Sequence, residues 1–439
     1  MKYLPLISAV SLLLAMGKYS QASDADVKDA PVNEGAVLDA ASAEQGSLQY
    51  SPQYYSSQYY LEGFLLGSLE DSYQKLFVMG LLTLEQSDYK ASIVIFYEML
   101  KRTSSPRVKL ELARALFLDR QFNSAKALFQ EVLFETETPW AVKQNIRLYL
   151  NQIDNDIGYV KFDISFISDS NPENFTSNEE VNIAGQAFKV VQPLGNREVK
   201  GLRLNMNSGL PVSADARTQA LLNVSFTDFA GSEFDRLVGS VGIISSFELL
   251  PKIKAKAGVE YSGKNGKKQY DFSYLSVFYT PSIVDQFSFR HEVRVGKLKV
   301  DGASHLDADV YRVASVFTRP LKNGIFLDGG VTVEKSIARE DPYSYDEGTL
   351  SLGLDLPVSD WGVNLSAALG LRLYADVDPF FGERRRDTNQ KLGFLLSHKK
   401  INAYGYKPEV GVTYEQNDST LAFFEYDKVS LVFSFKESY

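Results

Sequence analysis

The sequence predicts a chain in two parts, an N-terminal α-helical solenoid followed by a 14-stranded antiparallel transmembrane β-barrel. Three observations carry this prediction: an apolar stretch typical of a signal peptide, a helical repeat, and strict alternation of apolar and polar residues after residue 156. The alternating segments are about ten to thirteen residues long, enough for a tilted strand to cross a bilayer. With 439 residues, the chain has room for two domains with separate cores.

The composition excludes several kinds of site. The chain has no cysteine, so we expect no disulfide, no thiolate nucleophile, no cysteine-bound zinc and no lipid attached through a cysteine. Its formal charge is −9 and its Lys and Arg residues are scattered, which is not the basic footprint of a nucleic-acid-binding protein. We therefore expect no nucleic acid among its partners.

The N-terminus resembles a secretory signal. Lys2 precedes an apolar run from Leu4 to Met16, and Ser20-Gln21-Ala22 has the small-x-small pattern of a cleavage site. Residues 1–22 are thus predicted to be a signal peptide, with an uncleaved anchor helix as the alternative. Residues 23–60 form a polar leader without periodicity, which we expect to be disordered.

Residues 61–153 show a helical period and an internal repeat with an offset of 33 residues, the separation of Tyr89 and Phe122. The matched positions are Tyr89 with Phe122, Ser92 with Ala125, Phe96 with Phe129, Met99 with Val132, Leu100 with Leu133, and Pro106 with Pro139. Gly80 matches Ala113 at the same offset. The pattern resembles the tetratricopeptide repeat, in which small residues let two helices approach and an aromatic residue fills the core.

We therefore predict a tetratricopeptide-like domain whose core positions are Gly80, Ser92, Phe96, Ala113, Ala125 and Phe129. Ser92 stands where the repeat usually has Ala. The concave side of such a solenoid would suit a peptide or a partner helix. A helical bundle without a binding role is the alternative.

Residues 157–439 alternate with a period of two. Val160, Phe162, Ile164 and Phe166, for example, are separated by polar residues. Short turns are expected near Pro211, Pro251, Pro281, Pro320, Pro357 and Lys400. Six such turns delimit seven hairpins, hence fourteen strands, an even number as in single-chain bacterial barrels. Residues 186–191 could be a further strand, and we interpret them as part of the first long loop or an extension of strand two.

The last predicted strand resembles the C-terminal signal by which the barrel-assembly machinery takes up outer-membrane proteins. The residues that carry this resemblance are Lys428, Ser430, Phe433 and Phe435. Together with the signal peptide, they predict a protein of the cell outer membrane whose N-terminal domain lies in the periplasm. We expect a monomer in contact with the lipid bilayer and with lipopolysaccharide, whose phosphates the basic run Arg384 to Arg386 beside Phe380 and Phe381 could meet. An ordinary charged loop is the alternative for that run.

No motif in the sequence predicts covalent chemistry. The three histidines, His291, His305 and His398, do not have metal-ligand spacing. Ser72 and Lys75 match a Ser-x-x-Lys motif, but its partner motifs are absent. We predict no catalytic, cofactor-binding or metal residues, no cofactor and no enzyme. A catalytic group among the lumen-facing acids remains a third option.

One further resemblance concerns the whole arrangement. The first strand runs into Asp169-Ser170-Asn171, followed by Asn174. A turn of this kind, on a barrel preceded by tetratricopeptide repeats, resembles the surface lipoprotein assembly modulator family, called Slam (type XI secretion). The resemblance implies an outer-membrane translocon that delivers a surface lipoprotein or a secreted haem- or metal-capturing protein, with the repeats as periplasmic receptor. The alternative is a porin or substrate-specific channel with a periplasmic interaction domain.

Overall fold

The structure is a computed structural model that describes residues 72–135, 138–183, 186–190, 198–213, 215–281, 287–398, 401 and 406–437. The predicted signal peptide and polar leader, and the first residues of the predicted repeat domain, lie outside the described residues.

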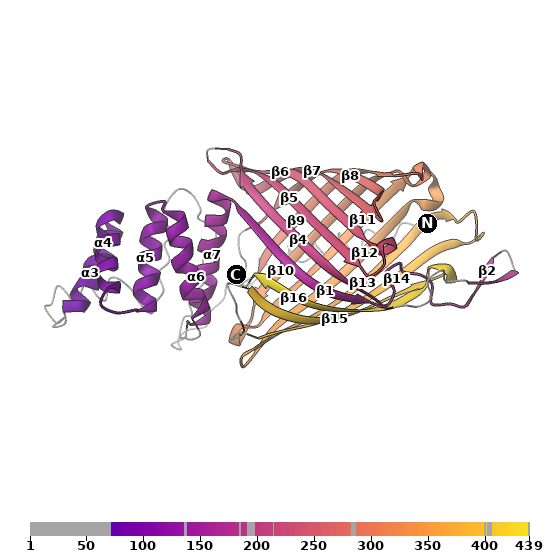
Figure 1. Ribbon diagram of the computed structural model, residues 1–439. Helices are drawn as coiled ribbons and strands as arrows, with labels where there is room; N and C mark the ends of the chain where they lie inside the picture. Colours follow the sequence, from indigo (N-terminus) through magenta and orange to yellow (C-terminus); the bar gives the residue numbers. More distant parts are fainter. Residues whose placement is uncertain are drawn as a thin grey trace, which may run out of the picture. The chain divides into compact units, whose positions relative to one another are not determined.

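The helical segment contains five described α-helices (Figure 1). They are α3 (Ser72–Glu85), α4 (Tyr89–Leu100), α5 (Pro106–Leu118), α6 (Phe122–Phe134) and α7 (Trp140–Ile157). Local residues explain where two of them start. The Asp88 carboxylate accepts a hydrogen bond from the Ala91 amide at 3.1 Å, which caps α4. Pro106 occupies the first turn of α5, where its missing N–H removes no helical hydrogen bond.

All six predicted repeat-core residues are buried within this segment. A Cβ atom on Gly80 would lie 2.6 Å from Cε1 of Phe96, so α3 and α4 need glycine at this close approach. Ser92 also has a specific partner, because its hydroxyl donates to the Gly80 carbonyl oxygen at 3.0 Å. This bond explains how a serine is accommodated in place of alanine. The assignment of these helices to the tetratricopeptide repeat itself stays a prediction.

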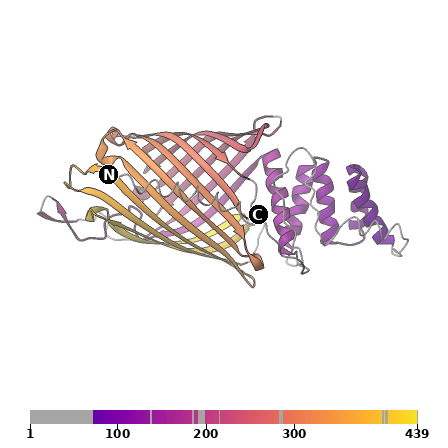
Figure 2. The same cartoon turned by 180° about the vertical axis from the view of Figure 1, so that it is seen from behind.

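Fourteen strands form a closed antiparallel barrel, as the sequence predicts. They are β1 (Tyr159–Asp169), β4 (Val199–Pro211), β5 (Thr218–Phe229), β6 (Arg236–Phe247), β7 (Leu250–Lys264), β8 (Lys267–Tyr279), β9 (Ser288–Val300), β10 (Ala308–Pro320), β11 (Phe326–Ala338), β12 (Tyr345–Val358), β13 (Trp361–Val377), β14 (Arg384–His398), β15 (Tyr406–Ser419) and β16 (Tyr426–Glu437). Each strand pairs with its neighbours in the chain, and β1 pairs with β16 to close the wall. Seen from behind, the wall continues with the same oblique strands (Figure 2).

Two short strands, β2 (Glu180–Ile183) and β3 (Gln186–Lys189), pair only with each other. They belong to the connection between β1 and β4, so residues 186–189 lie in the first long loop and add no strand to the barrel. This connection follows the first strand at one end of the barrel, which we call the loop end.

The opposite end, which we call the turn end, carries all six connections that the sequence marks as short turns. At this end Arg217 donates to Glu248 at 2.6 Å, which links two neighbouring turns and lowers the pKa of the Glu248 carboxyl. At the loop end, Asn265 and Gly266 connect β7 to β8 with φ of 50° and 69°. Asn-Gly suits this two-residue hairpin because both positions need positive φ.

The outer face of the barrel is apolar. Phe162, Leu350 and Val410 are each more than half exposed, on three different strands. Near the turn end this face carries aromatic pairs, such as Trp361 with His398, whose ring centroids are 4.5 Å apart. An apolar band with aromatic residues at its border is the outer surface of a transmembrane barrel. No helix among the described residues is long and apolar enough to span a membrane.

We predict that Phe129→Ala destabilises the helical segment by about 3–5 kcal/mol, because Phe129 is fully buried and stacks on Tyr149 at a centroid distance of 4.8 Å. Val94→Ala is the control, since Val94 is exposed on α4, and it should change stability by less than about 0.5 kcal/mol. Hydrogen exchange of the helical amides in the full chain measures both values. Equal effects of the two substitutions would show that Phe129 is not a core residue.

Candidate functional site

The inner face of the barrel is polar, and its charges form an ordered row near the loop end. Residues that are direct partners on adjacent strands point to the same face of a sheet. Such pairing joins Glu334, Glu347, Arg372, Asp387 and Ser419 in sequence from β11 to β15. Because the neighbouring residues on these strands form the apolar outer face, the row lines the lumen.

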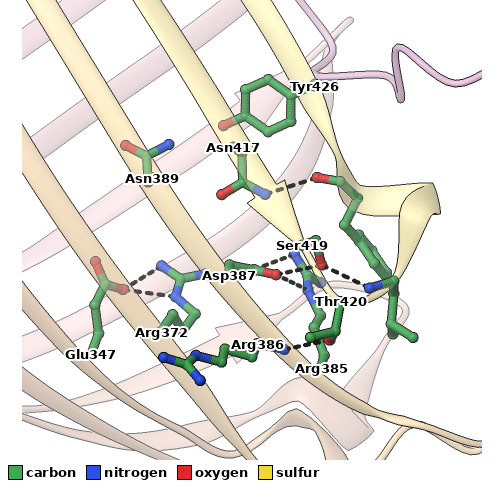
Figure 3. A network of polar contacts seen from close by, with 12 residues as sticks. Glu347, Arg372, Arg385, Arg386, Asp387, Asn389, Asn417, Ser419, Thr420 and Tyr426 are labelled. Atoms are coloured by element: carbon green, nitrogen blue, oxygen red, sulfur yellow. Dashed lines mark hydrogen bonds and ion pairs between the residues drawn. The ribbon is translucent and has the colours of Figure 1, made fainter.

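Two arginine–carboxylate pairs hold this row together (Figure 3). Arg372 donates to Glu347 through Nε at 2.7 Å and through Nη2 at 2.6 Å. Arg385 forms a two-point contact with Asp387, in which Nε donates to Oδ1 at 3.0 Å and Nη2 to Oδ2 at 2.7 Å. Ser419 completes the second pair by donating to Asp387 at 2.8 Å. Two-point contacts fix the orientation of both groups, so this wall of the lumen is rigid as well as charged.

Aromatic rings cover the cationic side chains of the row. The Arg372 guanidinium lies 4.4 Å from the Tyr345 ring centroid, and that of Arg385 lies 3.4 Å from the ring centroid of Phe424. Phe424 belongs to the short helix η6 (Ala422–Phe424) in the last loop, and Asn417 donates to its carbonyl oxygen at 2.8 Å. The last loop is therefore anchored directly to the charged row.

A cavity of about 560 Å³ lies beside this network. It is lined by Asn174, Glu347, Thr349, Ala368, Gly370, Arg372, Arg385, Asp387, Asn389, Lys391, Glu415, Asn417, Phe424 and Tyr426. The lining offers amides, carboxylates and guanidinium groups, which can exchange hydrogen bonds with water or with a polypeptide backbone. Within the described residues, no group of three or more His, Cys, Asp or Glu side chains is placed to hold a metal ion.

The turn that resembles the family motif folds into a compact loop next to this cavity. Asp169 accepts from the Asn171 amide at 2.9 Å. The Asn171 side chain then accepts from the Phe175 amide at 2.9 Å and donates to the Phe175 carbonyl oxygen at 2.8 Å. Asp and Asn suit these positions because their side chains bond to nearby backbone groups. Asn171 is buried, so the motif is part of the barrel mouth and not a free surface loop.

Residues 170–178, which we call the mouth segment, bridge two sides of the barrel opening. On one side Thr176 donates to the Ala422 carbonyl oxygen at 2.6 Å, and Asn178 donates to Glu425 at 2.7 Å. On the other side Glu173 forms ion pairs with Lys264 on β7 and with Arg236 on β6. The mouth segment therefore joins the last loop to strands on the far side of β1, β4 and β5.

An apolar cluster inside the mouth supports this arrangement. It consists of Ile167, Val199, Phe229 and Phe234, all buried, with Val432 packed against them. Their burial removes apolar surface from the lumen next to the mouth segment. The sequence singles out Asp169, Ser170 and Asn171 but gives no sign of the partners that hold them.

Several other predicted residues lie apart from the site. His291 stacks on Tyr279, His305 contacts Tyr343 and His398 contacts Trp361. Phe433 and Phe435 pack against each other on the outer face of β16 at a centroid distance of 5.0 Å, while Ser430 faces the lumen. Their role as an assembly signal stays a prediction. Lys428, predicted only as part of that signal, also donates to Asn174 at 2.8 Å and so joins the site.

The expectation of one basic cluster at Arg384 to Arg386 needs correction. These residues lie on β14, where alternate side chains point to opposite faces. Arg385 points inward to Asp387, whereas Arg386 is paired with Leu373 of the outer face. Only Arg384 and Arg386 remain available to lipopolysaccharide on the outer side.

We predict that Arg385→Met lowers the free energy of barrel unfolding by about 3 kcal/mol, because it leaves the buried Asp387 carboxylate without its cation. Arg385→Met combined with Asp387→Leu should recover most of this loss, since no buried charge is then unpaired. Arg386→Met, on the outer face, is the matched control. Guanidinium titration of the protein in lipid vesicles measures all three, and a double variant as unstable as the single one would contradict the pairing.

Comparison with known proteins adds to this picture. Residues 245–439 match the family described as "Surface lipoprotein assembly modifier". A relative, Surface lipoprotein assembly modifier 1 of Haemophilus influenzae, is 23% identical over 373 residues, which cover 79% of this chain and 74% of that protein.

Two solved outer-membrane structures align with the barrel. The channel DcaP of Acinetobacter baumannii has a TM-score of 0.38 and 9% identity, and covers 63% of this chain and 96% of its own. A loop-deletion mutant of OmpT of Vibrio cholerae has a TM-score of 0.35 and 11% identity, and covers 64% and 99%.

The family match and the closed barrel with its apolar outer face place the chain in the cell outer membrane. The matched residues span β7 to β16 and so include the charged row of the lumen. The C-terminal part of this chain, residues 245–439, is thus similar to the surface lipoprotein assembly modifier (Slam) family, the family that the turn after the first strand also resembles.

Proposed function

We propose that this protein is an outer-membrane translocon that delivers a client surface lipoprotein across the membrane through its barrel. The observation that carries the proposal is a polar lumen whose mouth holds the motif-bearing segment 170–178, fastened by hydrogen bonds to the last loop. A closed barrel satisfies all its backbone groups in the membrane and leaves its inner face free to be polar. Transport of this kind needs no catalytic residue.

The mouth segment is suited to act as a removable closure. Its contacts to the last loop are hydrogen bonds, and its contacts to β6 and β7 are made by the Glu173 side chain and the Pro172 carbonyl oxygen. Such contacts contribute about 1 kcal/mol each in net terms, so an arriving chain can replace them. The apolar cluster beneath the segment does not depend on it, because Ile167, Val199 and Phe229 belong to strands and Phe234 to the short helix η2 (Ser232–Phe234).

The helical segment is the proposed periplasmic receptor. Helix α7 ends at Ile157 and β1 starts at Tyr159, at the turn end of the barrel. Single-chain bacterial barrels keep their short turns in the periplasm. The segment also exposes apolar side chains, Met79, Val94 and Tyr97, which offer contact area to a client or its chaperone. We further propose that the chain functions as a monomer and enters the membrane through the barrel-assembly machinery.

The proposed client is a protein of the cell surface. The family name supports a surface lipoprotein. A secreted haem- or metal-capturing protein is a narrower possibility that the family resemblance implies. A porin with a periplasmic interaction domain is the competing function, and the deletion experiment below separates the two.

The proposed orientation predicts which turns can be reached from outside the cell. Epitope tags beside Asn265, Gly302 or Phe381, all at the loop end, should bind antibody on intact cells. Tags beside Asp215 or Asn323, at the turn end, should bind only after the outer membrane is opened. If the turn-end tags bound antibody on intact cells and the loop-end tags did not, the barrel would have the opposite orientation and the helical segment would lie outside the cell.

Removal of residues 61–153 should abolish client delivery, because the proposed receptor is lost while the barrel remains. The measurement is protease shaving of a lipoprotein encoded beside this protein, in cells with the full or shortened chain. Heat-dependent migration of the shortened chain in gels is the control for barrel folding. If client exposure survives deletion of the entire protein while uptake of a small sugar or antibiotic falls, the protein is a porin and the translocon proposal is wrong.

A further inference from the structure

One wall of the lumen carries basic side chains that the charged row does not include. Lys252, Lys254 and Lys256 occupy successive inward positions of β7. The alternate residues Ile253, Ala255 and Ala257 point to the outer face, as the exposed Val259 on the same strand does. The Lys256 ammonium lies 5.3 Å from the ring centroid of the buried Tyr274, which fixes the face on which the three lysines lie.

Arginines extend this basic surface across β9 and β10. Direct strand pairing links Lys256 to Ser276, Ser276 to Arg294, and Arg294 to Arg312, so all four share the inner face. The Arg294 guanidinium covers the other part of the Tyr274 ring at 4.6 Å from its centroid. Arg290 lies two residues before the inward residue Glu292 and therefore also faces the lumen. We call the set Lys252, Lys254, Lys256, Arg290, Arg294 and Arg312 the basic wall.

Some members of the basic wall have no acidic partner among the described residues. The Glu292 carboxylate on β9 accepts from Arg294 at 2.8 Å and from Ser276 at 2.8 Å. In the described part of the chain, Lys254, Arg290 and Arg312 form no ion pair within 4.0 Å. Arg312 is paired across the strands with Glu334, but Glu334 accepts from the Tyr345 hydroxyl, and Nε of Arg312 is buried without a hydrogen-bond partner. A buried donor without a partner is costly, so this atom indicates a place for an acceptor.

The opposite wall of the barrel differs. The closed strand order places β7 and β14 seven strands apart in either direction, hence across the lumen from each other. On β12 to β15 several acids have cationic partners, as in Glu347 with Arg372, Asp387 with Arg385 and Glu415 with Lys391. A positive wall facing a neutralised one produces a field across the lumen that attracts anionic groups to β7.

The spacing of the basic wall selects an extended polypeptide among anionic ligands. Alternate residues of a strand lie about 6.8 Å apart, and an extended peptide presents its own alternate side chains at the same spacing. Three lysines in line can therefore meet three carboxylates of one extended segment. The planar guanidinium groups of the neighbouring arginines can each bind a planar carboxylate at two points. A small anion would use only one of these positions.

We propose that the basic wall is a binding track for extended acidic segments of a polypeptide. The proposal deepens the function proposed above, because the track lines the path assigned to the client. Its ligand is defined by chemistry: consecutive carboxylates on an extended chain.

The test uses the purified full-length protein in detergent and two fluorescent peptides, a decamer of glutamate and a decamer of lysine. Lys252→Gln, Lys254→Gln and Lys256→Gln together should weaken binding of the glutamate peptide about tenfold, since three screened charge contacts are lost. The control combines Lys297→Gln, Lys299→Gln and Lys335→Gln, which remove three lysines from the outer face of β9 and β11. It should change binding less than about twofold, apart from weak long-range effects. Heat-dependent gel migration confirms that both variants fold.

The track would be overturned if the unmodified protein did not bind the glutamate peptide, or if the inner-face variant bound that peptide equally well. It would also be overturned if the lysine peptide bound as well as the glutamate peptide, or if inorganic phosphate at matched charge displaced the glutamate peptide. The last outcome would show a site for small anions. The translocon proposal is tested separately, by display of the client on the cell surface. If the inner-face variant loses peptide binding but still displays the client, the track stands and the client does not use it.

Discussion

The pairing of β1 with β16 is the constraint on which the rest of the structure depends. In a bilayer an open sheet edge would leave backbone groups without partners, so the first and last strands must meet. Their register brings Asp169 opposite Ser430. The loop that leaves β1 therefore starts beside the hairpin that enters β16, and Ser170 exchanges hydrogen bonds with Val429 at 3.0 and 2.9 Å. Closure of the barrel thus places the motif-bearing segment in the mouth.

Closure also gives the wall two chemically different faces. Each strand alternates, so one face receives the apolar residues and the other the charged ones. The inner face is itself divided, with paired charges on β12 to β15 and a basic surface on β7 to β10. The mouth segment contacts Lys428 on β16, which also pairs with Glu415 of β15, and Lys264 on β7.

The strand count and the six turns follow from local patterns, so the sequence alone was sufficient to predict them, whereas for residues 186–191 it left a loop and an extension of strand two as alternatives. The buried positions Phe96 and Phe129 also follow from an internal repeat. The charged row does not, because the partners Glu347 and Arg372 are 25 residues apart and meet only through strand register. Alternation on β14 explains why the basic run at Arg384 to Arg386 is not one cluster. The pairing of Glu173 with Lys264, 91 residues apart, depends on the path of the first loop.

In the proposed function, a client polypeptide passes through the lumen of the barrel. A photoreactive amino acid can be placed at inward positions, Thr349 on β12 or Asn389 on β14, and at the outward neighbours Leu350 and Leu392 on the same strands. During export of a tagged client, irradiation should yield crosslinks from the two inward positions and none from the outward ones. Crosslinks only from the outward positions, or from neither set while the client still reaches the surface, would contradict passage through the barrel.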